Sequence, residues 1–465
     1  MIICSRLIKA AWIIVPAFAV SMLMAHAARA SEPVVLGLEQ LIQMALDTSP
    51  EIKEAEQDVK AAQSDLAQAK GGRWAQLELV ATMGPAQNAS EPIVAVDPVT
   101  FKGKLEDRDK NELGFFGRLD LAIVQPLYTF GKISNRIDAA MSGVEAQKAA
   151  RLKKQGEIIL NVKELYYGYI VANQGAAVAK DADGFIQDAR KRIERLLEAG
   201  ARHVSPSDLY RLGAYEAEIE SFKFKAESGA RLAYLALKKA VGLPDRREFR
   251  LDTQVLPMEI KELADQEQYI SQALDQRPEF DQLKSAISAK KSLVRAAKAD
   301  LYPSVFLAGI GSFAGAPDRE ELDISYFRDE FNHLEGGIVL GSAWHFDFGI
   351  SQGRLEKARA EHLKVLHTKE FAERNIPLEV ARHYQDCLEA QASFQAYEKA
   401  AVASRRWIVA AFSNFDFGVG TAKDMFDSIE KYGKNQGDFL LSLYNYNVSL
   451  ARLSYAVGEY RSSLQ

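Results

Sequence analysis

Asp424 and Asp427 are the two residues whose type and spacing point most directly to a function. Both follow a turn that we predict at Gly418, and a spacing of three places two carboxylates on one face of a helix. Asp424 also has a structural interpretation, because it is the third residue after Thr421 and could complete a capping box at the start of that helix. Asp427 lies beyond the capping positions, so its charge needs another explanation.

The other reactive side chains form no pattern typical of catalysis. His383 and Cys387 are four residues apart, as metal ligands can be, but no third ligand accompanies them and we expect both to be structural. We find no nucleophile with a base, no phosphate-binding loop and no zinc signature. The sequence therefore predicts a protein that is not an enzyme and that needs no metal or cofactor. An exported hydrolase is the alternative, and an activity screen on the purified protein would test it.

Residues 1–30 are typical of a secretory signal peptide. Arg6 and Lys9 precede an apolar run over 10–24, and Ala28-Arg29-Ala30 offers a cleavage site before Ser31. The apolar run is short for a membrane anchor, which is the structural alternative. We therefore expect the mature chain to leave the cytoplasm.

The composition of the mature chain limits its partners. Three of the 58 basic residues lie in the expected signal peptide, so 55 basic residues face 63 acidic ones and the net charge is near −8. This excess of negative charge disfavours nucleic acid as a partner. Cys387 is the one cysteine left after cleavage, which excludes an internal disulfide.

The chain contains one long unit twice. Residues 45–51 return as 273–279, which lie 228 positions later, with Ala-Leu-Asp and Pro-Glu in the same places. Further equivalent pairs are Phe130 and Phe348, Gly131 and Gly349, Arg136 and Arg354, and Gly200 and Gly418. We divide the chain into the signal peptide at 1–30, a first repeat at 31–242, a connecting segment at 243–263 and a second repeat at 264–465.

Each repeat predicts the same order of elements. Two helices, the second beginning at Pro50 or Pro278, lead to a strand, a polar loop, a second strand, one very long helix and a returning helix. We expect strands at 77–83, 118–128, 304–311 and 337–348, loops at 84–116 and 312–335, and long helices at 132–199 and 351–417. In the second strand Leu119, Leu121 and Ile123 alternate with smaller or charged residues, which predicts one apolar and one wet face. The fold class is mainly α with a small β part.

Helix lengths and strand number predict an elongated assembly. A helix of about 68 residues spans roughly 100 Å, so it can lie beside two shorter helices stacked end to end. Four strands per chain cannot close a barrel alone, and unpaired edges are not tolerated in lipid. Strands from two, three or four copies could close one, and a conducting tube needs more than eight strands. These physical arguments do not choose between three copies and four.

The repeated Ala-Leu-x-x-x-Pro-Glu, the segment 125–131 and the glycine-turned helical hairpins resemble the TolC-type outer-membrane efflux proteins. The resemblance covers residues 36–460. It implies a homotrimer with a 12-strand barrel in the outer membrane, continued by a helical barrel in the periplasm. It implies a passive exit duct in tripartite efflux or type I secretion. A periplasmic adaptor (membrane fusion) protein and an inner-membrane transporter would deliver the substrate, whose identity stays open.

The same resemblance gives roles to the residues near the hairpin turns. It implies that Asp424 and Asp427 form two rings of three carboxylates, a cation-attracting gate at the periplasmic mouth. Glu216 falls one residue out of register with a family acidic position. Glycines at the turns, whose positive φ needs glycine, would also mark where the adaptor docks: Gly200, Gly418 and Gly420. A periplasmic coiled-coil scaffold without channel activity is the alternative, but it does not explain the matched strand pairs.

Overall fold

A computed structural model describes residues 34–87, 93–106, 113–317, 319 and 329–463, so the expected signal peptide lies outside the described residues. The chain forms two compact units. Unit 1 comprises Met1–Pro50, Gln155–Gln266 and Val380–Gln465, and unit 2 comprises Glu51–Lys154 and Glu267–Glu379. Each unit therefore takes segments from both sequence repeats.

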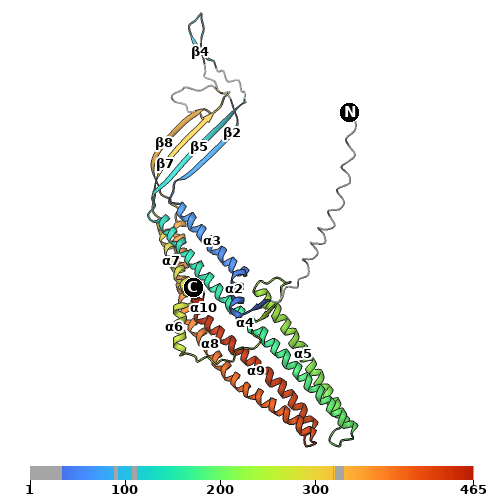
Figure 1. Ribbon diagram of the computed structural model, residues 1–465. Coiled ribbons are helices and arrows are strands. Elements are labelled where there is room, and N and C mark those ends of the chain that lie inside the picture. Colours follow the sequence, from blue (N-terminus) through green and yellow to red (C-terminus); the bar gives the residue numbers. More distant parts are fainter. Residues whose placement is uncertain (1–33, 88–92, 107–112, 318, 320–328, 464–465) are drawn as a thin grey trace, which may run out of the picture. The chain divides into compact units, whose positions relative to one another are not determined.

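The long and short helices and the strands of the four-stranded sheet follow the order that the duplication predicts, while four further short strands and a last short helix among the described residues were not predicted (Figure 1). They are β1 (Val34–Leu36), α2 (Leu38–Thr48), α3 (Pro50–Gly71), β2 (Gln76–Gln87), β3 (Ile93–Val96), β4 (Gly103–Glu106), β5 (Leu113–Tyr128), α4 (Lys132–Glu198), α5 (Pro206–Ala240), β6 (Phe249–Leu251), α6 (Gln266–Gln276), α7 (Pro278–Ala299), β7 (Ser304–Gly315), β8 (His333–Ala343), α8 (Ile350–Asp416), α9 (Ala422–Val457) and α10 (Tyr460–Ser463). Equivalent elements match in length: α2 and α6 have 11 residues, α3 and α7 have 22, β2 and β7 have 12, and α4 and α8 have 67.

Unit 2 contains a four-stranded antiparallel sheet in the order β2-β5-β7-β8. The predicted alternation in β5 is confirmed, because Leu119, Leu121 and Ile123 are exposed on one face while Arg118 and Asp120 lie on the other. Neighbouring strands add to the apolar face, which is exposed in the single chain: Leu77, Leu79, Met83, Phe313, Leu334, Ile338 and Leu340. The sheet thus has one face suited to hydrocarbon and one suited to water.

The prediction of a polar loop over 84–116 was partly wrong. β2 continues to Gln87, β5 already begins at Leu113, and β3 pairs with β4 between them. Gly84 and Pro85 read as strand breakers in the sequence. They are tolerated because β2 is an edge strand of the sheet, where a missing N–H costs no ladder bond.

A buried ion cluster fixes the helix pair at the start of α7. The guanidinium of Arg277 lies 2.9 Å from Glu279 Oε1 and 3.1 Å from Glu379 Oε2, and its side chain is 7% exposed. Burial acts to raise the pKa of Glu279, but hydrogen bonds from Arg277 and its positive charge outweigh that effect and hold this pKa below its usual range. Glu279 therefore stays ionised in the folded protein.

Replacing Arg277→Ala would remove the main counter-charge of the buried Glu279 and leave it with Lys153, whose Nζ lies 3.7 Å from Oε1. We expect a cost of about 3–5 kcal/mol, seen as a lower thermal midpoint by circular dichroism at pH 7. Because the pKa of Glu279 is depressed on folding, the native stabilisation is present above its unfolded value of about 4.3 and is lost as pH falls through the folded value. The variant should lose less stability than the native protein between pH 7 and pH 3. Equal midpoints at pH 7 would contradict this account.

Candidate functional site

Two glycines end the long helices of unit 1 in left-handed turns. Gly200 closes α4 with φ 67° and Gly418 closes α8 with φ 70°. The Gly200 N–H donates to Leu197 O and the next N–H donates to Leu196 O, both at 3.0 Å, and the turn after α8 has the same pair of bonds. A residue with a Cβ would be strained at this positive φ, so both glycines have the turn role that the sequence predicts.

Position 420 favours glycine for a different structural reason. Its N–H donates to Asn414 O at 2.9 Å, and its φ is not positive. A Cβ at this position would lie 3.0 Å from the backbone carbon of Asn414 and 3.0 Å from the nitrogen of Phe415. A side chain here would require the backbone at the end of α8 to shift by a few tenths of an ångström, so glycine suits this tight reversal of the chain.

The two turns lie against each other and share one core. The rings of His203 and Phe415 are 5.7 Å apart in an edge-on arrangement. Below them a core cluster draws on α4, α5, α8 and α9: Ile186, Ala189, Ile193, Val204, Leu212, Ile408, Phe412, Phe415, Ala422, Met425, Phe426, Ile429 and Tyr432. At the turn itself two large apolar side chains are left in solvent, Phe417 (82% exposed) and Val419 (78%).

Asp424 is the third residue of α9 and does not complete a capping box. Thr421 Oγ1 accepts a hydrogen bond from the Asp424 N–H at 3.1 Å, which is one arm of the box. In the equivalent helix α5 both arms are present, and Asp208 Oδ2 accepts from the Ser205 N–H at 2.9 Å. Within the described part of the chain, the Asp424 carboxylate makes no hydrogen bond or ion pair. Its charge thus stays available.

Asp427 is held by a neighbouring helix hairpin. Tyr215 Oη on α5 donates to Asp427 Oδ1 at 3.4 Å, and Lys423 Nζ lies 3.9 Å from Oδ2. Burial and the negative charge of Asp427 raise the pKa of Tyr215, so the hydroxyl keeps its proton and remains a donor. Sequence reasoning missed Tyr215, because no local pattern shows that α5 and α9 are neighbours.

Glu216 is next to Tyr215 but points to another partner. It forms an ion pair with Arg190 on α4 and accepts a hydrogen bond from Gln187 Nε2 at 2.8 Å. A second ion pair joins Arg192 on α4 to Asp416 at the end of α8. The structure therefore brings Asp427 and Glu216 to the same helix cluster, while the charge of Glu216 is largely compensated.

His383 and Cys387, whose spacing would suit metal ligands, do not form an ion site with a third ligand among the described residues. His383 Nδ1 lies 3.6 Å from Asp386 Oδ2, and burial raises the pKa of the Cys387 thiol, which disfavours the thiolate that metals bind. Across the ranges that the structure describes, no group of three or more His, Cys, Asp or Glu side chains could hold a metal ion.

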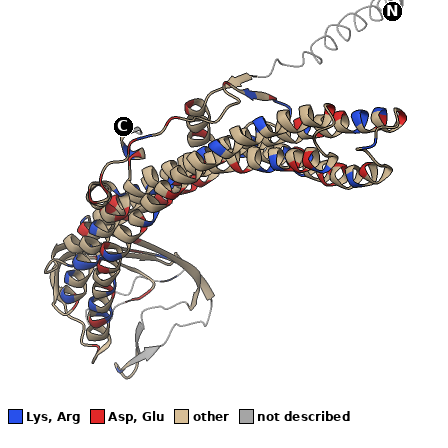
Figure 2. Ribbon diagram, turned by 90° about the horizontal axis from the view of Figure 1, so that it is seen from below, with Lys and Arg blue, Asp and Glu red and all other residues tan. Residues whose placement is uncertain are grey.

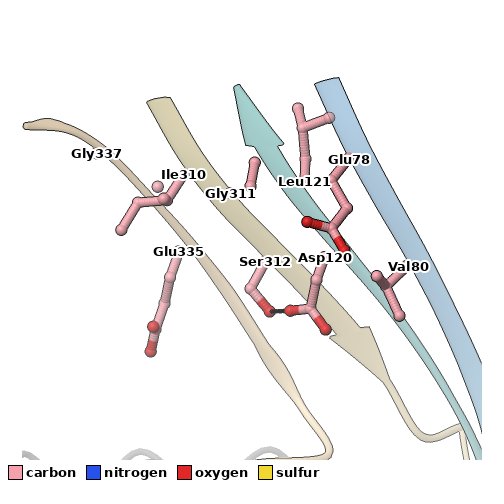
Figure 3. Close-up of a pocket in the computed structure, with 11 residues that line it drawn as sticks. Glu78, Val80, Asp120, Leu121, Ile310, Gly311, Ser312, Glu335 and Gly337 are labelled. Carbon is pink, nitrogen blue, oxygen red and sulfur yellow. Dashed lines mark hydrogen bonds between the residues drawn. The ribbon is translucent and has the colours of Figure 1, made fainter. Parts of the chain in front are cut away.

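The polar face of the sheet carries a second group of carboxylates (Figure 3). Glu78 on β2, Asp120 on β5 and Glu335 on β8 lie around a hollow of about 560 Å³. Asp120 accepts a hydrogen bond from Ser312 Oγ at 2.7 Å, and that oxygen lies 2.8 Å from His333 Nε2. Figure 2 shows charged residues spread along the helices and few on the strands. The Asp, Glu and Arg residues of the four strands, Glu78, Arg118, Asp120 and Glu335, all lie on this face of the sheet.

Comparison with known proteins identifies the family. Residues 41–242 and 269–459 match the outer membrane efflux proteins, and the two segments coincide with the two repeats. The chain belongs to this family. It is an outer-membrane channel component of efflux systems, with a large helical part in the periplasm, and the family consists of channel proteins rather than enzymes. A search of curated protein sequences found no match.

Solved structures show the same fold. The outer-membrane channel OprN is 18% identical, with 90% of this chain and 89% of that chain covered at a TM-score of 0.72. VceC of Vibrio cholerae is 20% identical, with 90% and 96% covered at 0.69. MtrE of Neisseria gonorrhoeae, solved in an open state, is 16% identical, with 90% and 88% covered at 0.71. A membrane-spanning helix is not found among the residues that the structure describes.

Gly420→Ala should disturb the turn alone. The added methyl group meets backbone atoms at 3.0 Å, so we expect a cost of roughly 1–3 kcal/mol, localised to the end of α8 and the start of α9. Hydrogen exchange of residues 412–426 should rise while that of the sheet is unchanged. Gly213→Ala is the matched control, because a Cβ there meets no atom within 4 Å. Equal exchange in the two variants would contradict the steric argument.

Proposed function

We propose that three copies of this chain form one channel and that Asp424 and Asp427 form its periplasmic gate. The observation that carries the gate is the uncompensated Asp424 carboxylate at the start of α9, close to a hairpin turn. Three-fold symmetry would repeat it as a ring, with a second ring from Asp427. Carboxylate rings attract cations and concentrate them at a constriction.

The homotrimer is supported by the open edges of the sheet. β2 and β8 each have one unpaired side in the single chain. An apolar sheet face in lipid requires that these edges be paired. Three copies would supply 12 strands, the number implied by the family, and the polar face with Asp120 and Ser312 would line the water-filled interior.

Opening would require movement between the two helix hairpins. The bond from Tyr215 to Asp427 joins α5 to α9, and the pair of Arg192 with Asp416 joins α4 to α8. An iris-like shift of the tip helices must break or stretch these contacts. Glu216, through Arg190, would keep α5 attached to α4 as they move, and we assign it to positioning within the gate.

The hairpin tips would receive a periplasmic adaptor, which links the channel to an inner-membrane transporter. Gly200, Gly418 and Gly420 keep the turns tight, and Phe417 and Val419 present apolar surface beside them. Exposed apolar groups on a small rigid turn are suited to a protein partner. The transporter supplies the energy and the channel serves as a passive exit duct.

Removing the two gate carboxylates should change ion flow. In planar bilayers, Asp424→Ala combined with Asp427→Ala should raise single-channel conductance or weaken block by divalent cations, since the negative rings are gone. Asp438→Ala, which removes one carboxylate further along α9, should leave both unchanged. Native conductance and native block in the double variant would remove the gate assignment.

Tip docking can be tested with a photoreactive amino acid at Val419. In the native host it should crosslink to a periplasmic adaptor protein, identified by mass spectrometry. The same amino acid at Leu232, which is 69% exposed on α5, should not. Strong crosslinking from Leu232 with none from Val419 would place the docking surface elsewhere on the helices.

A further inference from the structure

An aromatic cluster closes the junction between the two hairpins of the sheet in one chain. Phe130 follows β5 and Tyr302 precedes β7, and their rings stack 5.3 Å apart with an interplanar angle of 15°. Tyr128 packs edge-on against Phe130 at 4.7 Å. β5 and β7 are hydrogen-bonded neighbours, so this cluster lies where the first repeat meets the second.

The duplication places equivalent aromatics at the two open edges of the sheet. Trp74 precedes β2 by two residues, as Tyr302 precedes β7. The turns before them match, because the Trp74 N–H donates to Gly71 O and the Tyr302 N–H donates to Ala299 O, again 228 positions apart. Phe130 comes two residues after the end of β5 and Phe348 five residues after the end of β8, but both have a positive φ, 50° and 49°, and both precede a glycine with positive φ.

Within the described ranges of one chain, these equivalent rings have no aromatic partner. Phe348 is 103% exposed and Trp74 is 74% exposed, whereas Phe130 and Tyr302 are 41% and 45% exposed. A phenylalanine with positive φ is strained, and such strain persists when surrounding contacts hold it. Phe130 has those contacts within the chain. Among the described residues, Phe348 makes no ring contact.

We propose that Phe348 of one copy packs against Trp74 of the next copy and closes the ring where β8 meets β2. This inference rests on the proposed oligomer and adds its contact. This contact between two copies would be equivalent to the Phe130–Tyr302 stack within one copy. The occupant is a second copy of this chain, because the missing half of each contact is present on its opposite edge.

The strand pairings predict the register between copies; they are used in place of the spacing to Phe130 and Phe348, because β5 has a register irregularity between Pro126 and Tyr128. Within the chain, Ile123 of β5 pairs with Gly309 of β7. Leu77 pairs with Ile123, and Val305, which lies 228 positions after Leu77, pairs with Ser342, so Ser342 is the equivalent of Ile123. Ala81 is the equivalent of Gly309, again 228 positions apart. Ser342 of β8 should therefore pair with Ala81 of the next copy's β2. This register keeps the apolar face continuous around the ring. A slip of one residue would turn every side chain to the wrong face.

Cysteine crosslinking of the purified full-length protein tests the register. Ala81→Cys with Ser342→Cys should, on mild oxidation, give reducible covalent species of up to three chains. Val80→Cys with Ser342→Cys should not, because its thiols face opposite sides. The native Cys387 is buried and should remain unreacted. An intact oligomer that crosslinks in the Val80 pair but not in the Ala81 pair would overturn the register. A monomer by mass in detergent would instead overturn the proposed oligomer.

A double-mutant cycle tests the aromatic contact itself. Trp74→Ala and Phe348→Ala should each speed oligomer dissociation in detergent by roughly tenfold, and the double variant should be no faster than either one. Multiplied effects in the double variant would show that the rings do not touch. A single variant that does not assemble is combined with Ala81→Cys and Ser342→Cys. Covalent rings that form on oxidation support the contact, and scattered or absent crosslinks contradict it.

Discussion

Unpaired backbone groups along a sheet edge cannot be satisfied by hydrocarbon, and this constraint governs the rest of the structure. The four-stranded sheet exposes one apolar face and two open edges. A single chain in lipid would leave both edges without hydrogen-bond partners. Closure by identical copies follows, and it explains why the chain carries matched hairpins rather than a complete barrel of its own.

The duplication also gives two helical hairpins whose turns lie together. Equal lengths of α4 and α8 bring both hairpin turns together in unit 1, where His203 meets Phe415. Left-handed glycines end the helices abruptly, so the return helices start within a few residues. As a result Asp424 and Asp427 lie close to the turn, where the proposed gate would change its width through small movements of the helices. Ion pairs and the Tyr215 hydroxyl link the four helices without fixing them through a disulfide.

Much of the fold could be predicted because its signals are local or repeated. Pro50 and Pro278 mark helix starts, alternation in β5 marks a wet and an apolar face, and the helix lengths follow from their turns. Pro85 was misleading, because a single sequence does not show which strand lies at an edge. Tyr215 could not be predicted either, since its contact with Asp427 joins residues 212 positions apart.

In the candidate site, too, local features could be predicted from the sequence and contacts between distant residues could not. Glycine turns were predictable from backbone chemistry, whereas the interpretation of Asp424 as cap or free charge depended on one hydrogen bond that sequence spacing cannot decide. The pairing of Glu216 with Arg190 likewise required the positions of α4 and α5. The internal repeat is more informative, because comparing its two halves shows which aromatic rings are left without partners among the described residues.

Single-channel recording of the purified mature protein in planar bilayers, with its mass in detergent determined on the same sample, tests the central claim most directly. We expect steady cation-selective openings from a species of about three chains. A monomer that never conducts would contradict closure by identical copies, and with it the channel that we derive from this sheet.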